Sequence, residues 1–161
     1  MQDWMGHHFG LIVPFYFAGL WVAICYFASF LSGWHLLSKR FQTKGEFHGP
    51  KRILQSADMR FNSRYNGCLT VGADSSGLFL VPLFIFRLGH PPLLVPWSEI
   101  LTQRKKRFFG LMDVVELQLG RSEEVPLTIN MKLAAWIEAA VGTDWPTGYP
   151  KATPSPPRLI G

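Results

Sequence analysis

The chain has 161 residues, of which 48% are hydrophobic and 17% are charged, and its net charge is +5. Soluble domains usually contain about a quarter charged residues, so this composition excludes a purely soluble protein. It also excludes a disordered chain, a disulfide scaffold and a polytopic transporter. Asp3 is the only charged residue before Lys39, so residues 1–38 carry −1 and the remaining 123 carry +6. The chain therefore has an apolar beginning and a basic remainder.

The apolar beginning predicts a membrane-spanning helix at residues 9–31. Residues 4–38 include no Asp, Glu, Lys or Arg, and 23 apolar residues exceed the roughly 20 needed to cross about 30 Å of hydrocarbon. Trp4 and Trp34 lie where interfacial aromatic residues are expected. A cleavable signal peptide is the alternative, but it would have a basic start and a shorter apolar core. We predict that residues 1–38 form an uncleaved leader and span.

The charges that flank this span predict its orientation. The leader contributes only Asp3, whereas basic residues follow the span closely: Lys39, Arg40, Lys44, Lys51 and Arg52. The positive-inside rule therefore places the N-terminus outside and the domain that follows in the cytoplasm.

One face of the span carries small side chains, namely Ala18, Cys25, Ser29 and Ser32. Such residues let helices approach each other closely in lipid. Two interpretations remain open: small residues are simply common in spans, or this face packs against another helix.

A basic connector at residues 39–50 ends in Gly49-Pro50, a typical turn. The region that follows, 51–142, contains short runs with β propensity. Two of them, 68–74 and 77–82, flank a hairpin turn at 75–77. The other expected strands are one or two within 52–65, and then 92–97, 101–109, 113–119 and 124–129.

The last element has helical periodicity. Asn130 can cap a helix that ends at Gly142, and its apolar stripe consists of Leu133, Trp136, Ile137, Ala140 and Val141. Antiparallel strands covered by one amphipathic helix predict an α+β fold, in which a β-sheet or small barrel is capped by a C-terminal helix.

The order of these elements resembles the pleckstrin-homology-like and GRAM-like domains. The resemblance covers about residues 50–142 and depends on the Pro96-Trp97-Ser98-Glu99-Ile100 turn, which is similar to a strand-to-strand corner of the family. Small bacterial membrane proteins carry such domains after a membrane helix. The resemblance therefore implies a non-catalytic binding or assembly module at the bacterial inner membrane, and it identifies no ligand residues here.

Candidate chemistry is sparse. Cys25 lies in the span and Cys68 opens a strand, so we expect both to be reduced. His7 and His8 are separated from His35 by roughly 40 Å of helix and cannot share one metal or haem. Each could ligate a haem or pigment singly or could be a solvated interfacial side chain. The other two histidines, at 48 and 90, are expected in turns without a special role. We predict no catalytic residues, no metal and no cofactor.

The densest charge is the run Arg104, Lys105, Lys106 and Arg107. Because neighbouring strand residues face opposite sides, both faces would be charged, which favours an edge strand or an exposed loop. On an edge strand such charges block unwanted pairing. The other interpretation is contact with anionic lipid headgroups, together with Lys39, Arg40 and Lys44. Nucleic-acid binding is not expected.

The tail at residues 143–161 contains five prolines and little that could form a core of its own. We expect it to bind neighbouring subunits through Trp145, Tyr149, Leu159 and Ile160. Together these features predict a non-catalytic accessory subunit of a larger membrane complex, for example a respiratory or photosynthetic one. The alternative is a free membrane-anchored module that binds anionic lipid or a peptide.

Overall fold

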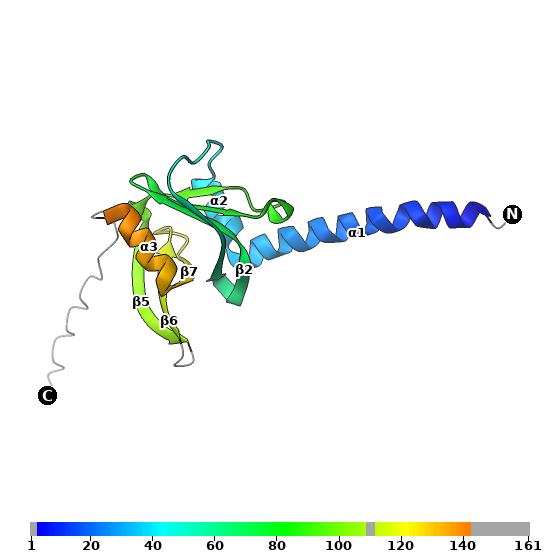
Figure 1. The fold of residues 1–161 in the computed structure, drawn as a ribbon. Coiled ribbons are helices and arrows are strands. Elements are labelled where there is room, and N and C mark those ends of the chain that lie inside the picture. The colour runs from blue at the N-terminus through cyan, green and yellow to red at the C-terminus, as the bar shows by residue number, and fades with distance from the viewer. Residues whose placement is uncertain (1–2, 109–111, 143–161) are drawn as a thin grey trace, which may run out of the picture.

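The chain is an α+β protein in which a long N-terminal helix leads into an antiparallel sheet and a C-terminal helix (Figure 1). The computed structural model describes residues 3–108 and 112–142. The side chains of residues 3–11, 62 and 102–113 lie outside this description, and so do the residues predicted to anchor the tail: Trp145, Tyr149, Leu159 and Ile160.

Two helices precede the sheet, α1 (Asp3–Ser32) and α2 (Trp34–Phe41). Gly33 separates them with a φ of 80°, a left-handed conformation that side chains disfavour. Within the described ranges, one segment is long and apolar enough to cross a membrane: Ile12–Ser32, 21 residues with a mean hydropathy of 1.7. The predicted N-terminal apolar helix is therefore confirmed, and the first residues of the predicted connector belong to α2.

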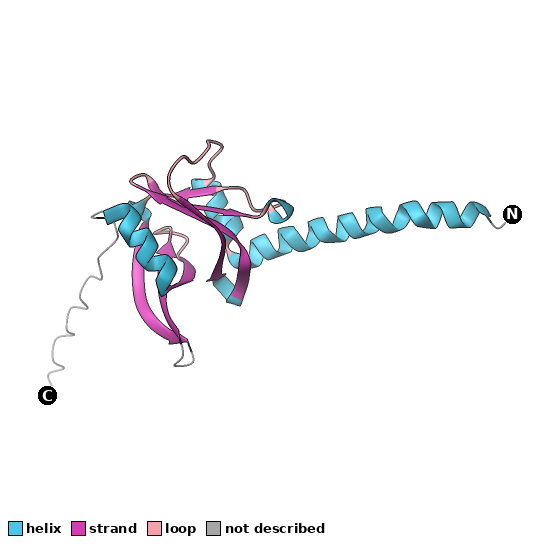
Figure 2. Cartoon of the chain, in the orientation of Figure 1, coloured by secondary structure: helices cyan, strands magenta, loops and turns pink. Residues whose placement is uncertain are grey.

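The sheet contains seven antiparallel strands in the order β4-β3-β2-β1-β7-β6-β5 and curls into a nearly closed barrel (Figure 2). The strands are β1 (Lys51–Met59), β2 (Ser63–Asp74), β3 (Gly77–Pro82), β4 (Leu93–Val95), β5 (Ile100–Phe108), β6 (Met112–Leu119) and β7 (Val125–Asn130). Three short 3₁₀ helices join them: η1 (Arg60–Asn62), η2 (Phe84–Phe86) and η3 (Trp97–Glu99). The predicted hairpin between β2 and β3 is confirmed, with Asp74 paired to Gly77.

The basic run 104–107 lies in β5, which is an edge strand as the sequence predicts. Its pairing with β6 shifts between Gln103 and Lys105, so Arg104 lies at an irregularity of the ladder. The simple two-residue alternation expected for this run is therefore interrupted.

The C-terminal helix α3 (Met131–Val141) begins at its predicted cap, because the Asn130 side chain accepts a hydrogen bond from the Leu133 N–H at 2.8 Å. Leu133 and Ile137 are buried against the sheet as expected. Ala140 was also expected on this face but is exposed, and Ala134 is buried instead. The buried residues of α3, Leu133, Ala134 and Ile137, all lie in its first two turns, whereas Ala140 lies in the last turn.

The connector between α2 and β1 is held to the sheet by Phe47. Its ring stacks on Phe79 with centroids 4.7 Å apart. Gly72 makes room for this contact, since a Cβ atom there would lie 2.4 Å from the Phe47 ring. Further along, the Ala73 N–H donates to the Pro50 carbonyl at 3.2 Å. The β domain is thus joined to α1 through packed structure rather than through a free linker.

Candidate functional site

The strongest candidate site is the buried junction where α1 and α2 meet the β domain. Trp34, the first residue of α2, is fully buried there. Its indole Nε1 donates to the Pro91 carbonyl at 2.9 Å, and its ring lies edge-on to His90 with centroids 5.4 Å apart. The sequence-based assignment of Trp34 to the membrane interface is wrong, because the turn at Gly33 directs α2 into the domain core.

The side chains of Ser32, Tyr65 and His90 form a chain of hydrogen bonds in this junction, and Ser29 adds a bond of its own. The Tyr65 hydroxyl lies 3.0 Å from both Ser32 Oγ and His90 Nε2. Ser32 Oγ also donates to the Ser29 carbonyl at 3.2 Å, and Ser29 Oγ donates to the Gly89 carbonyl. Buried polar groups must be paired to avoid a desolvation penalty. These bonds therefore join α1 to strand β2 and to the loop that precedes β4.

Both ring nitrogens of His90 have partners. Nε2 lies 3.0 Å from the Tyr65 hydroxyl, and Nδ1 lies 3.4 Å from the Leu88 carbonyl. A neutral imidazole donates from one nitrogen and accepts at the other, so the tautomer sets which of these contacts His90 donates to. Pairing of the buried polar groups is the condition for a stabilising network.

Burial shifts the pKa of both titratable side chains in the direction that favours the neutral form. Desolvation lowers the pKa of His90 below 6.5 and raises the pKa of Tyr65 to about 12. His90 is therefore neutral at pH 7. The sequence assigned His90 to a turn without a special role; the structure corrects this and places it in the core of the junction.

The predicted small face of α1 is divided by this junction. Cys25, Ser29 and Ser32 are buried against the chain's own β domain, whereas Ala18 is exposed on the free part of the helix. Close approach does occur, as small residues permit: a Cβ atom on Gly89 would lie only 3.3 Å from the Cα of Tyr26. Ser29 thus contacts the loop before β4, and Ser32 contacts strand β2, both of the same chain.

The basic residues predicted to contact lipid do not form one cluster. Lys39, on α2, and Lys44, in the connector, are exposed. Arg40 is engaged within the chain, 3.5 Å from a carboxylate oxygen of Glu99 and 3.2 Å from one of Glu123. Strand β5, with residues 104–107, lies on the side of the β domain away from α1 (Figure 1).

The histidines considered as single haem or pigment ligands are also separated. His35 is exposed on α2, while His7 and His8 lie in α1 with side chains outside the described residues. Among the described residues, no group of three or more His, Cys, Asp or Glu side chains is placed to hold a metal ion.

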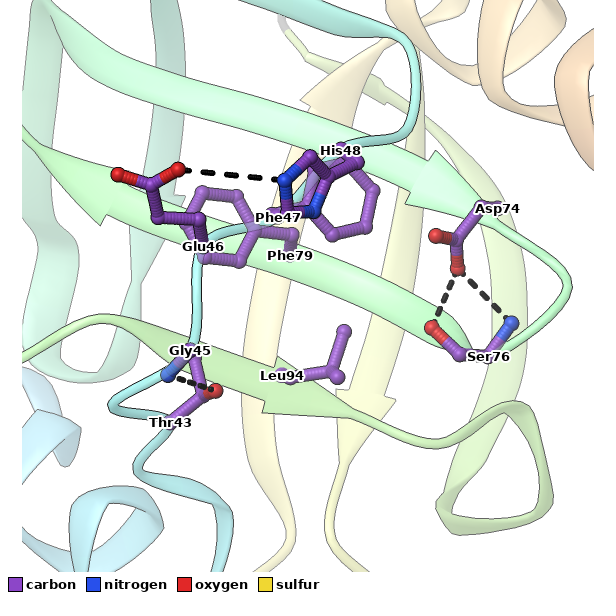
Figure 3. A pocket seen from close by; sticks show the side chains of 9 residues that line it. All are labelled: Thr43, Gly45, Glu46, Phe47, His48, Asp74, Ser76, Phe79 and Leu94. Atoms are coloured by element: carbon purple, nitrogen blue, oxygen red, sulfur yellow. Dashed lines mark hydrogen bonds and ion pairs between the residues drawn. The ribbon is translucent and has the colours of Figure 1, made fainter.

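A second, shallower feature is a pocket of about 210 Å³ between the connector and the hairpin (Figure 3). Phe47 and Phe79 stack at its base, and the Asp74 carboxylate accepts a hydrogen bond from the Ser76 N–H at 2.8 Å. Its lining residues are Thr43, Gly45, Glu46, Phe47, His48, Asp74, Ser76, Phe79 and Leu94. Its polar groups bond to one another along the loops, so the pocket shows no set of side chains converging on a ligand.

No family model, curated protein or solved structure matches the chain. The geometry of the junction and the α+β fold are therefore the observations from which function is argued.

Proposed function

We propose that the chain is a single-span protein of the bacterial inner membrane and a non-catalytic accessory subunit of a larger membrane complex. Its β domain would be a pleckstrin-homology-like assembly module, with the N-terminus outside and the domain in the cytoplasm. The seven-stranded order with one C-terminal helix supports this assignment of the module. The basic residues after α1 support the orientation.

The observation that carries the proposal is the buried junction. A domain held in a fixed orientation to the bilayer suits a subunit that bridges neighbours, because its contact surface is already positioned and less ordering is needed on binding. The contacts of Ser29, Trp34 and Tyr65 fix the β domain on α1. Ala18, the exposed residue of the small face nearest the N-terminus, remains available to a partner helix within the membrane.

The alternative function is a free module that binds anionic headgroups, favoured by the exposed Lys39 and Lys44 beside the span. Each basic residue near an anionic surface contributes about 1 kcal/mol. Two such residues give weaker binding than the larger set that the sequence suggested.

Native sizing after extraction in mild detergent separates these two functions. A subunit is expected in a large, stable particle, whereas a free module would migrate as one 18.3 kDa chain in its micelle. Ala18→Leu should shrink the particle by blocking close helix approach. Ala23→Leu is the matched control, since Ala23 is also exposed on α1 but lies about 140° around the helix from Ala18. A monomeric native protein would refute the subunit proposal.

Orientation is tested separately by labelling an exposed position of the β domain. Ser75→Cys, in the β2–β3 turn, should react with a membrane-impermeant maleimide only after the inner membrane is opened. Labelling in intact spheroplasts would reverse the proposed topology.

A further inference from the structure

The loop from Leu83 to Leu88, which contains η2, lies beside α1 (Figure 2). Phe84 is 76% exposed, and Ile85 and Leu88 are also exposed large hydrophobic residues. Three such side chains on one short loop form the kind of patch that marks an interaction surface.

The loop packs along the second half of the candidate span. Trp21 Nε1 donates to the Ile85 carbonyl at 3.2 Å, and its ring lies 5.5 Å from that of Phe86. Trp21 precedes Ser32, the last residue of the span, by 11 residues, or about 16 Å of helix. The loop therefore reaches well along the segment that the bilayer would surround.

The rest of α1 indicates how far the hydrocarbon extends. Phe30 is 70% exposed, and Phe27 is exposed one turn earlier on the side that the β domain leaves uncovered. Hydrocarbon that covers Phe30 must also surround a loop that packs against Trp21, because Trp21 lies nine residues closer to the N-terminus.

The backbone of the loop is suited to such a place, where unpaired polar groups are costly. The Leu83 and Phe84 carbonyls accept from the Phe86 and Arg87 N–H groups at 2.9 and 3.2 Å. The Arg87 carbonyl accepts from the His90 N–H at 3.0 Å. The Ile85 and Gly89 carbonyls accept from side chains of α1. The exposed Arg87 side chain is long enough to extend from such a position toward the headgroups.

We infer that the loop Leu83–Leu88 is a second membrane-inserting element, which enters the same leaflet as the C-terminal half of α1 and contacts lipid through Phe84, Ile85 and Leu88. This inference rests on the proposed membrane anchoring by α1. Its occupant is lipid hydrocarbon, because the patch is continuous with the exposed apolar surface of the span. The junction then orients the β domain by two membrane contacts instead of one.

The test measures lipid contact at single labelled positions of the full-length protein in vesicles of phosphatidylethanolamine and phosphatidylglycerol. An environment-sensitive fluorophore is attached at Phe84→Cys or, in a second variant, at Leu88→Cys. Both are exposed, so the label does not have to enter the core. Cys25→Ala and Cys68→Ser remove the native thiols. Lipids with a nitroxide on the acyl chain serve as quenchers.

Two positions provide the controls. Phe17→Cys lies on the exposed surface of α1 and reports the span itself, while Leu101→Cys is an exposed apolar residue of β5 on the far side of the β domain. We expect blue-shifted, quenched emission at 84, 88 and 17 and unquenched emission at 101. Emission at 84 and 88 that matches 101 while 17 is quenched would overturn the loop insertion alone. Unquenched emission at 17 would overturn membrane anchoring as well.

Discussion

Removing the Tyr65 hydroxyl tests whether the junction stabilises the protein. Tyr65→Phe keeps the ring beside Trp34, with centroids 5.8 Å apart, but removes both 3.0 Å contacts of the hydroxyl. The bond to Ser32 contributes about 1 kcal/mol, and the buried Nε2 of His90, left without its hydrogen-bond partner, costs a further ~1–2 kcal/mol. We therefore expect the free energy of unfolding of the β domain to fall by about 2–3 kcal/mol.

The assay is urea unfolding of the detergent-solubilised protein, followed by tryptophan fluorescence at pH 7.5. Tyr16→Phe is the matched control, because Tyr16 is exposed on the free part of α1 and its hydroxyl lies far from the junction. The control should stay within about 0.5 kcal/mol of the wild type, as is usual at surface positions. If Tyr65→Phe behaved like this control, the hydrogen-bond chain would not stabilise the junction and the reasoning would be refuted.

Three further predictions concern the turn at Gly33, the buried His90 and the ion pairs of Arg40. Gly33→Ala should lower the thermal midpoint, because φ is 80° and the new Cβ would lie 3.0 Å from Val125. The expected strain is about 1–2 kcal/mol. The control is Gly19→Ala, which has open space around it and should be neutral or stabilising. Because burial lowers the pKa of His90, the contribution of its neutral form to stability is complete above pH 6.5 and is lost as the pH falls below that value. The thermal midpoint of the wild type should therefore drop more between pH 7.5 and 5.5 than that of His90→Gln. Equal drops would contradict this. Arg40→Ala should change the unfolding free energy by less than about 1 kcal/mol, since its two ion pairs are partly exposed, and a larger loss in urea titrations would show that they are stronger than their exposure implies.

Much of the fold is encoded locally and could be predicted. The long uncharged run specifies α1, and turn residues separate the β runs, so the hairpin at 74–77 and the capped helix after Asn130 lie where the sequence places them. Local patterns do not report rotation or register. The burial of Ala134 rather than Ala140 on α3 and the ladder shift at Arg104 could therefore not be predicted from the sequence.

The candidate site was harder to predict because its members come from four separate segments. Trp34 and His90 are 56 positions apart, and each has an ordinary local explanation, one as an interfacial aromatic residue and the other as a turn histidine. The pattern that could have revealed the site is the one already noted on α1: Cys25, Ser29 and Ser32 indicate close packing but not the partner. Only tertiary structure shows that this partner is the chain's own loop.

The proposed function depends most directly on α1 and the β domain being joined rigidly. Spin labels at Phe17→Cys on α1 and Leu101→Cys on β5, in the background without native cysteines, report this directly through the distance distribution in nanodiscs. Both sites are exposed, and Figure 1 shows β5 on the side of the β domain away from α1. A single narrow distribution is predicted, and it should broaden in Tyr65→Phe. A broad distribution in the wild type would mean that the domain swings on a flexible tether, which would contradict the fixed orientation on which the proposed function rests.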